Sequence, residues 1–318
     1  MAIRNPRISV LMSVYNGEEF LKESIESILN QTFADFEFIF IDDGSTDASE
    51  EIVHSFSDPR LVVVQQENIG LTKSLNKGLG LARGAYIARQ DADDISVSNR
   101  FEKQVAYLDA HPEVAVVGGS VVRVDDKGNA LRRLAFSRTH KKIKKCLYQG
   151  KNPLVHTTVM FRRQEIRSIG GYDESFSVNQ DYELWLRASE HFHLANLGDV
   201  LCHCRFHLGS ISSSHDRYPF IALLALRMNE KRRSSGTHSP SALDWESFVE
   251  AFEAESQIEI DARKRDFESH RMLKLSQAQA ATGDFPGAFR CLCQSIRMYP
   301  KMILSIPGGL FRYVRSHS

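Results

Sequence analysis

The chain has 318 residues, with 40 lysines and arginines against 40 aspartates and glutamates, and 42% of its residues are hydrophobic. This composition is typical of a soluble globular protein with enough apolar material for a core, and the length suggests about two domains, or one large α/β domain with an appendage. A formal net charge of zero disfavours a dedicated nucleic-acid binder, because such proteins usually carry excess positive charge that neutralises phosphates. We therefore expect no nucleic-acid partner.

The N-terminal segment shows no export signal. Residues 1–7 lead into a short apolar run that residues 15–19 interrupt, so the segment lacks the apolar region and cleavage site of a signal peptide. No apolar stretch approaches the roughly 20 residues that span a bilayer. The five cysteines are an odd number, which in a chain without an export signal favours reduced thiols. These features predict a cytoplasmic protein.

The first part of the chain alternates apolar runs with helical patterns, as a parallel α/β sheet requires. Strands are predicted at residues 7–14, 36–41, 61–64 and 85–90. Apolar residues at helical spacing predict helices over 21–29 and 71–82. Asp47 and Glu50 have the spacing of a capping box, which predicts a further helix after the second strand.

The pattern changes after residue 114. Two valine-rich runs, at 114–117 and 121–124, precede a turn signal at 125–129, which favours the edge of a mixed sheet over further β-α-β units. After residue 220 helical patterns dominate. We place a domain boundary near there, so that an α/β domain occupies residues 1–218 and a helical region occupies residues 219–318.

Acidic residues directly follow two of the predicted strands. They are Asp42 and Asp43 after the second strand, and Asp91, Asp93 and Asp94 after the fourth. Ligands of an open parallel sheet bind outside the carboxyl ends of its strands, so we expect both groups at one cleft. Asp91 and Asp93 lie two apart and can face the same Mg²⁺ or Mn²⁺, both of which prefer oxygen ligands. The alternative, that acidic residues here only form turns and caps, is favoured for Asp47.

Seven motifs follow one another in a fixed order along residues 7–215. They are Ser9-Val-Leu-Met-Ser-Val-Tyr-Asn16, Gln31-Thr-Phe33, Ile41-Asp-Asp-Gly-Ser-Thr-Asp47, Asn68-Ile-Gly-Leu71, Ala88-Arg-Gln-Asp-Ala-Asp-Asp94, Gly170-Gly-Tyr-Asp173 and Gln180-Asp-Tyr-Glu-Leu-Trp-Leu-Arg187. Together they resemble a family 2 glycosyltransferase of the bacterial polysaccharide-biosynthesis type. The resemblance implies the GT-A fold, a Rossmann-like mixed sheet flanked by helices, here with a helical C-terminal appendage. It also implies a nucleotide-diphosphate sugar donor, a divalent cation and an inverting reaction.

The resemblance assigns roles on the donor side of the site. Ser13 and Tyr15 match positions that contact the nucleotide base, although Tyr15 could instead pack against the first helix. Asp43 matches the carboxylate that reads the base or ribose. Asp93 matches the principal metal ligand of the DxD motif, with Asp91 on the nucleotide side.

Further donor-side positions are less specific. Asp94 matches a position beside the sugar or among the groups around the metal ligands. Arg89 lies on the same side of its strand as Asp91, where it could meet either the diphosphate or the carboxylates. Arg205 and His207 match the family's late basic motif, in which His207 could bind the diphosphate or the metal and Arg205 could balance phosphate charge.

Asp181 is the candidate catalytic base. It matches the second position of the family's acidic pair, and inverting transfer needs a carboxylate that accepts the proton of the attacking hydroxyl. This chain has Gln180 where the family usually has glutamate, which leaves the base intact but removes one charge beside it. The alternative is that Asp181 caps the following helix, which would depress its pKa, and the two roles can coexist.

Three other residues bear on the acceptor side, and a fourth has no defined role. Trp185 lies four residues after Asp181, so it either walls the acceptor pocket or packs in the core. Tyr172 and Asp173 follow two glycines in a loop over the cleft, where they contact the acceptor or sugar or form a plain turn. His156 matches a recurrent family position whose role the sequence does not define.

The cysteines raise the question of a zinc site. Cys202, His203 and Cys204 could combine with Cys291 and Cys293. Their spacing is not the usual CxxC pair, and nothing in the sequence brings the two segments together, so the sequence argues against zinc.

The C-terminal third has its own pattern. Residues 283–300 have the spacing of one tetratricopeptide-like helix, but a single unit is not stable alone, which favours an appendage packed on the catalytic domain. Residues 285–318 contain five basic residues and no acidic one, interleaved with apolar residues. Such a tail could lie on an anionic membrane surface that carries a lipid-linked acceptor. The alternative is that the tail is solvated or forms a homodimer contact.

The sequence thus predicts a metal-dependent inverting glycosyltransferase that uses a nucleotide-diphosphate sugar, with a UDP-sugar favoured. The predicted acceptor is a glycan or a lipid-linked glycan in surface polysaccharide synthesis, which would place the protein in the cytoplasm or on the inner face of the membrane. A sugar nucleotidyltransferase would need a glycine-rich basic loop after the first strand, which residues 13–17 lack. A non-catalytic helical scaffold would not need the acidic motifs.

Overall fold

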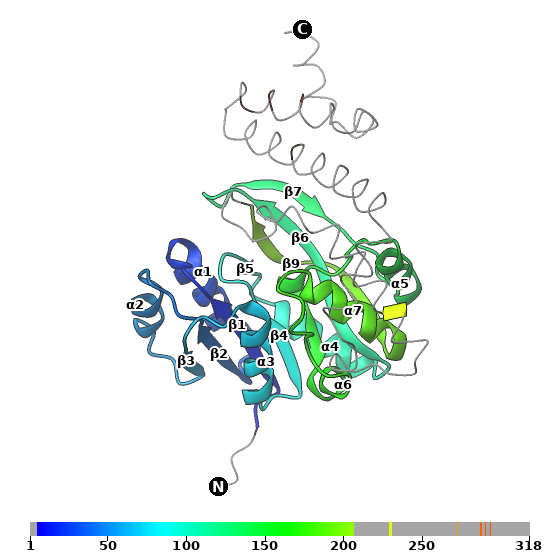
Figure 1. Cartoon of the computed structure of the whole chain (residues 1–318), viewed down its shortest axis with the longest axis horizontal. Helices are drawn as coiled ribbons and strands as arrows, with labels where there is room; N and C mark the ends of the chain where they lie inside the picture. Colours follow the sequence, from blue (N-terminus) through cyan, green and yellow to red (C-terminus); the bar gives the residue numbers. More distant parts are fainter. Residues whose placement is uncertain are drawn as a thin grey trace.

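The computed structural model describes residues 5–206, together with Asn229, Glu230, Met272, Gly287, Arg290 and Cys293. In this part of the chain, strands and helices alternate (Figure 1). The strands are β1 (Ile8–Val14), β2 (Phe36–Asp42), β3 (Leu61–Gln65), β4 (Tyr86–Arg89), β5 (Ile95–Ser96), β6 (Val114–Val124), β7 (Ala130–Leu134), β8 (Met160–Arg162) and β9 (His193–Arg205). The helices are α1 (Glu18–Leu29), α2 (Ser49–His54), α3 (Leu71–Leu81), α4 (Arg100–Ala110), α5 (His140–Tyr148), α6 (Arg163–Ser168) and α7 (Gln180–His191), with a short 3-10 helix at His156–Thr158.

One mixed sheet organises the described residues. Its order is β3-β2-β1-β4-β8-β6-β9-β5, and β7 pairs with β6. The first four strands of this order are parallel to one another, while β8 is antiparallel to both β4 and β6. In the register of the sheet Val14 lies opposite Asp42, so the carboxyl ends of β1 and β2 meet at the same edge, as predicted.

Helices cover both faces of the sheet, which explains why all seven residues of β1 and of β2 are buried. Alternate residues of β1 pack on opposite faces of the sheet. Val10 and Met12 pack in a cluster with residues of α1, α2 and α4. Leu11 packs in a second cluster with residues of α3, α5, α6 and α7. The predicted strands and helices of the first 90 residues are confirmed, because this two-sided burial leaves a clear apolar pattern in the sequence.

The second half of the sheet differs from the prediction. The valine-rich runs at 114–117 and 121–124 belong to one strand, β6, whose register with β9 shifts near Gly118 and Ser120. The mixed pairing is confirmed, but the edge position is wrong, because β8 and β9 come later in the chain and enclose β6. The turn at 125–129 is confirmed and joins β6 to β7, with the Gly128 amide donating to the Asp125 carbonyl.

The predicted capping box also differs. Helix α2 begins at Ser49 with Ala48 as its N-terminal cap. The Asp47 carboxylate accepts hydrogen bonds from the Ser49 amide and the Glu18 amide, both at 3.0 Å, and the Glu18 carboxylate accepts one from the Ala48 amide at 2.8 Å. The acidic residue that exchanges hydrogen bonds with the Asp47 segment is therefore Glu18 and not Glu50. This is possible because the turns after the parallel strands β1 and β2 lie side by side.

Several predictions fall outside the described residues. They concern His207, Cys291, the tetratricopeptide-like segment and the basic tail. Among the residues that are described, none of the helices combines the length and the hydrophobicity that a bilayer crossing demands.

The packing of α3 on the sheet yields a stability prediction. A Cβ atom added at Gly78 would lie 2.1 Å from Leu11 Cδ1 and 3.1 Å from Ile41 Cδ1, whereas one added at Gly80 meets nothing within 4 Å. We expect Gly78→Ala to lower the free energy of unfolding by about 1–3 kcal/mol through overpacking. Gly80→Ala is expected to raise it by up to about 1 kcal/mol, because alanine favours the helix. Denaturant unfolding of both variants checks this, and equal effects would contradict it.

Candidate active site

The loop that carries Asp91 and Asp93, here called the DxD loop, begins directly after β4. A buried arginine and a threonine hold it in place. The Arg89 guanidinium, whose side chain is 1% exposed, pairs with the Asp91 carboxylate at 2.6 Å. The Asp91 amide donates to the Thr157 hydroxyl at 3.1 Å. Of the two partners considered for Arg89, the structure therefore shows the carboxylate, since the guanidinium is buried beneath the loop.

Gln90 fixes the shape of this loop, a role that the sequence did not reveal. Its amide nitrogen donates to the Asp91 carbonyl at 3.1 Å and to the Asp94 carbonyl at 2.7 Å, which ties the two ends of the loop together. Its amide oxygen accepts hydrogen bonds from Arg100 and from the Ser96 hydroxyl. Gln90 is fully buried, so these bonds form without competition from water.

Asp91 and Asp93 have the chemistry of a divalent-cation site. Both are partly exposed, and both offer carboxylate oxygens. Burial raises the pKa of Asp91, and the charge of Asp93 acts in the same direction against the opposing charge of Arg89. A hard dication fits such a pair of carboxylates, because it would offset the repulsion that raises the pKa of Asp91.

Asp94 turns away from this pair and into the protein. It is 6% exposed, and its Oδ1 atom accepts a hydrogen bond from the Arg205 amide of β9 at 2.8 Å. Burial raises the pKa of this carboxyl well above its usual range. The structure shows Asp94 buried against β9, and its predicted position beside the sugar or around the metal ligands stays a prediction.

The Arg205 side chain ties together several loops around the site, and we call this set of contacts the Arg205 clamp. Its side chain is 2% exposed and pairs with Glu23 of α1 at 2.5 Å. The guanidinium also donates to the carbonyls of Asp93 at 3.1 Å and Asp126 at 2.8 Å. All three nitrogens of the guanidinium donate to protein acceptors, which gives Arg205 a structural role, and its role toward the diphosphate stays a prediction.

We expect Arg205→Ala to lower the free energy of unfolding by about 1–3 kcal/mol, because buried carbonyl groups such as that of Asp126 lose their donor. Glu23→Gln is the matched control, since the Glu23 side chain is 58% exposed. Its effect should be below about 1 kcal/mol, as for other exposed ion pairs. Denaturant unfolding distinguishes the two, and a larger loss in Glu23→Gln would refute the clamp.

The nucleotide-side residues lie at the carboxyl ends of β1 and β2. Ser13 is 9% exposed, whereas Tyr15 is 55% exposed, so the packing alternative for Tyr15 is not what the structure shows. Asp43 is 2% exposed, and its carboxylate accepts hydrogen bonds from the Ile69 and Gly70 amides at 3.0 and 2.9 Å. Asp43 therefore shapes the loop before α3.

Asp181 lies in the first turn of α7. The N-terminal cap is Asn179, in a left-handed conformation with φ 59°, so the capping alternative for Asp181 is wrong. Burial raises the pKa of Asp181 to about 6, and the charge of Asp91 adds to this rise. Hydrogen bonds from the Tyr182 amide and from Asn152 Nδ2, the latter at 2.7 Å, oppose it. The depressed pKa that a capping role would give is replaced by a raised one.

A buried aromatic cluster surrounds Trp185, which belongs to the same helix as Asp181. Trp185 is fully buried between the rings of Phe161 and His156, so it packs in the core and does not wall an acceptor pocket. His156 Nε2 lies 2.9 Å from the Tyr172 hydroxyl, and Tyr172 is 1% exposed. Burial lowers the pKa of His156 well below its usual value and raises that of Tyr172, so the pair is neutral.

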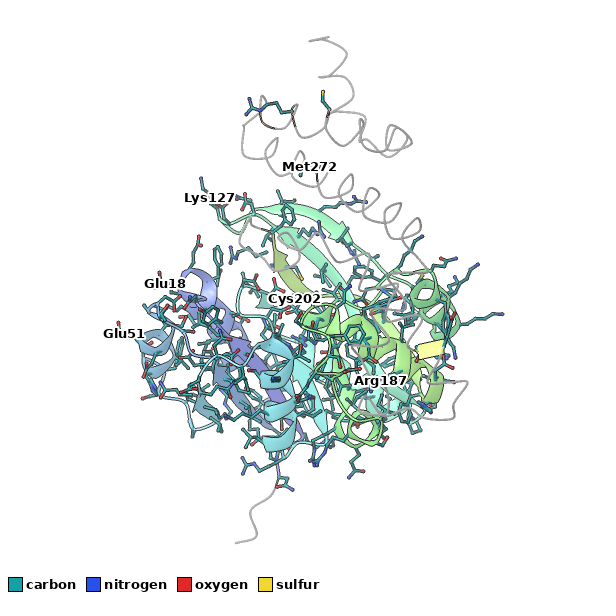
Figure 2. The ribbon with its side chains drawn as sticks, viewed as in Figure 1. Glu18, Glu51, Lys127, Arg187, Cys202 and Met272 are labelled. Atoms are coloured by element: carbon teal, nitrogen blue, oxygen red, sulfur yellow. The ribbon has the colours of Figure 1, made fainter. Side chains whose placement is uncertain are left out.

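The Gly170-Gly171 turn is held firmly and does not form an open loop. Both glycines have positive φ values, 93° and 67°, which other residues adopt with strain. Arg187 of α7, fully buried with its ion-pair partner Glu183, donates to the Gly171 carbonyl at 2.7 Å (Figure 2). Asp173 is 1% exposed and accepts a hydrogen bond from the Ser175 amide, as in a plain turn.

The parallel β3-β2-β1-β4 half, the antiparallel β8 insertion and the strand-end carboxylates define a glycosyltransferase of the GT-A fold. The family model for glycosyl transferase family 2 matches residues 9–170, and the chain belongs to this family.

Relatives extend this finding. The chain is 37% identical over 188 residues to the uncharacterized glycosyltransferase MJ1057 of Methanocaldococcus jannaschii, a match that covers 57% of this chain and 64%, less than two thirds, of the relative. It is 37% identical over 206 residues to the amylovoran biosynthesis glycosyltransferase AmsE of Erwinia amylovora, with 62% and 75% covered. It is 33% identical over 233 residues to the O-antigen biosynthesis glycosyltransferase WbnJ of Escherichia coli, with 71% and 90% covered.

Solved structures share the fold at low sequence identity. Residues 1–349 of TarS from S. aureus, in complex with UDP-GlcNAc, align with a TM-score of 0.57 and 17% identity over 90% of each chain. The mannosyltransferase PcManGT from Pyrobaculum calidifontis, in complex with GDP-Man and Mn²⁺, aligns with a TM-score of 0.55 and 16% identity over 98% of this chain and 84% of that chain.

Proposed function

We propose that this glycosyltransferase moves a sugar from a nucleotide-diphosphate donor to an acceptor hydroxyl, with inversion at the sugar carbon. One observation carries the proposal. Asp91 and Asp181 come from segments 90 positions apart in the sequence, yet the charge of Asp91 contributes to the raised pKa of Asp181. This supports one site that contains both the donor-side carboxylates and the candidate base.

Asp181 would accept the proton of the attacking hydroxyl. With a pKa of about 6 it is ionised at neutral pH, and it is more basic than an ordinary aspartate. The Asn152 side chain, which donates to Asp181 Oδ2, would orient the carboxylate. Asn152 lies outside the acidic and glycine-rich motifs, so sequence inspection did not select it.

Asp93 and Asp91 would hold a divalent cation, Mn²⁺ or Mg²⁺. When bound, such a cation neutralises charge on the leaving diphosphate. Support comes from the oxygen-only donor set, and from a structural neighbour that was solved with GDP-Man and Mn²⁺. The neighbour TarS was solved with UDP-GlcNAc, which supports a UDP-sugar as the favoured donor here.

The acceptor would be a glycan or a lipid-linked glycan of a surface polysaccharide. The names of AmsE and WbnJ, which refer to amylovoran and O-antigen biosynthesis, support this part of the proposal. We also propose that residues 1–218 form the catalytic domain and that residues 219–318 contact the inner face of the membrane or a second copy of the chain.

Tyr15 provides a test of donor binding. If its exposed ring stacks on the nucleotide base, Tyr15→Ala should cost about 1–3 kcal/mol of binding, or roughly 5–150-fold in the dissociation constant. Leu81→Ala, at another exposed apolar residue, should leave the affinity unchanged. Calorimetry with the nucleoside diphosphate measures both, and equal affinities for the two variants would contradict base stacking.

A donor screen tests the function itself. Thermal unfolding is measured with UDP-, GDP- and dTDP-sugars in the presence of Mn²⁺, because a bound donor stabilises the folded state. We expect one nucleotide class to raise the melting temperature most and to release its diphosphate when acceptor is added. Absence of both effects across the panel would instead support the non-catalytic scaffold.

A further inference from the structure

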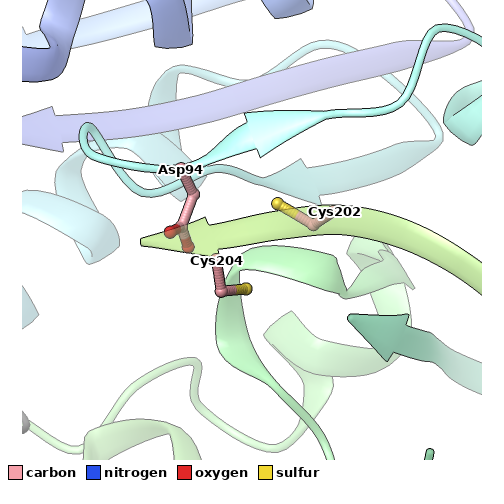
Figure 3. Close-up of side chains that lie close together, drawn as sticks. All are labelled: Asp94, Cys202 and Cys204. Carbon is pink, nitrogen blue, oxygen red and sulfur yellow. The ribbon is translucent and has the colours of Figure 1, made fainter. Parts of the chain in front are cut away.

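A second cluster of metal-ligating side chains lies next to the DxD loop. It comprises Asp94, from the loop after β4, and Cys202 and Cys204 of β9 (Figure 3). One ligand atom from each residue lies within 4.8 Å of the other two. The sequence did not suggest this set, because Asp94 and Cys202 are more than 100 positions apart.

The strand geometry selects the members of the cluster. Cys202 and Cys204 lie two apart on β9, so their side chains share one face, while His203 between them faces the other way. Ser96 and Ile95 of β5 pair with Cys202 and His203, which brings the adjacent Asp94 over β9. The Cys-His-Cys combination considered from the sequence is therefore replaced by one carboxylate and two thiols.

We propose that Asp94, Cys202 and Cys204 form a second cation site, one that takes a thiophilic divalent ion such as Zn²⁺. Thiolate ligands favour zinc, whereas the oxygen-only pair of Asp91 and Asp93 favours Mg²⁺ or Mn²⁺, so ligand chemistry separates the two sites. Two sulfurs bound to one zinc lie about 3.8 Å apart, given Zn–S distances of about 2.3 Å. In the structure the three ligand atoms already lie within 4.8 Å of one another.

The surroundings of the cluster suit a bound ion. Asp94 uses Oδ1 for the Arg205 amide, and no hydrogen bond among residues 5–206 engages its Oδ2. Cys202 is fully buried, whereas Cys204 is only partly buried. A zinc ion with three protein ligands would take a water as its fourth.

Charge also balances at this site. Binding of the ion would release the protons of both thiols and any proton on Asp94. The three anionic ligands and a dication then sum to one negative charge, and the fully buried Arg100 guanidinium interacts electrostatically with both cysteines. A bound ion would tie the DxD loop to β9, beside the hydrogen bond between the Arg205 amide and Asp94. We infer that it stiffens the loop that carries Asp93.

Titration of the full-length protein with Co²⁺, a spectroscopic substitute for Zn²⁺, tests the site. We expect a thiolate-to-cobalt charge-transfer band that saturates at one ion per chain and disappears when Zn²⁺ is added. Cys202→Ser and Cys204→Ser should lose the band, whereas Cys146→Ser, at a partly buried cysteine of α5, should keep it. Asp93→Asn should also keep it, which distinguishes this site from the proposed catalytic one.

A second measurement on the unaltered protein does not depend on the folding of the variants. Zn²⁺ should slow the alkylation of Cys204 but not that of Cys146, as mass spectrometry of the digested protein would show. A cobalt band that persists in both Cys202→Ser and Cys204→Ser would overturn the proposal. Absence of any zinc-dependent protection of Cys204 would overturn it as well.

Discussion

Replacement of Asp181 by asparagine is expected to lower the turnover number for sugar transfer by about 10²–10⁴-fold, the usual contribution of a general base. The reason is that the amide cannot accept the proton of the acceptor hydroxyl. The fold should persist, because an asparagine side chain has nearly the same size and its oxygen can still accept the hydrogen bond from Asn152 Nδ2. Release of nucleoside diphosphate in the presence of acceptor measures the loss.

The matched control is Asp199→Asn, which removes a carboxylate whose side chain is 49% exposed on β9. It should retain full activity. Donor affinity in Asp181→Asn should change little, since the proposed role of Asp181 concerns the acceptor hydroxyl and not the donor. Retained transfer in Asp181→Asn, with donor binding intact, would eliminate Asp181 as the base.

The pH dependence of turnover follows from the same residue. Burial raises the pKa of Asp181 to about 6, so the carboxylate becomes protonated as the pH falls through this value. Turnover should therefore be constant near neutral pH and fall about tenfold per unit well below pH 6. A profile that stays flat down to pH 4 would show that the base is a different group.

Loss of the metal site is expected to have the second large effect. Asp93→Asn should lower turnover by about 10²-fold or more, because several kcal/mol of charge stabilisation on the leaving diphosphate would be lost. Removal of divalent ions from the unaltered protein should have a similar effect, reversed by Mn²⁺ or Mg²⁺. Transfer is assayed across a metal titration, in which Asp93→Asn should need more metal or fail to respond.

Asp126→Asn is the control for Asp93, because its side chain is exposed and only its carbonyl contacts the Arg205 clamp. It should show the metal dependence of the unaltered protein. Full activity of the unaltered protein after chelation would mean that transfer does not depend on a divalent ion.

Local sequence patterns predicted much of the fold because their physical causes are local. Strand β1 is buried on both faces and therefore reads as an unbroken apolar run, and the stripe of α3 reflects one buried face. Asp91 and Asp93 could be placed for a similar reason, since residues after parallel strands lie at one sheet edge. The local pattern around β6 predicts a sheet edge, which is wrong because the neighbouring strands β8 and β9 follow it by dozens of residues.

The sequence by itself determined the family, the doubly covered sheet and the carboxylates at its edge. Only the tertiary structure decided what the buried polar groups do. The Arg205 side chain holds loops together, and the pKa of Asp181 is raised, whereas a capping role would have lowered it. The Asp94 carboxylate lies close to the thiols of Cys202 and Cys204 on β9. The physical reason is that desolvation, charge coupling and ligand geometry depend on which groups meet in space, and here the partners lie about a hundred residues apart or are buried by distant segments.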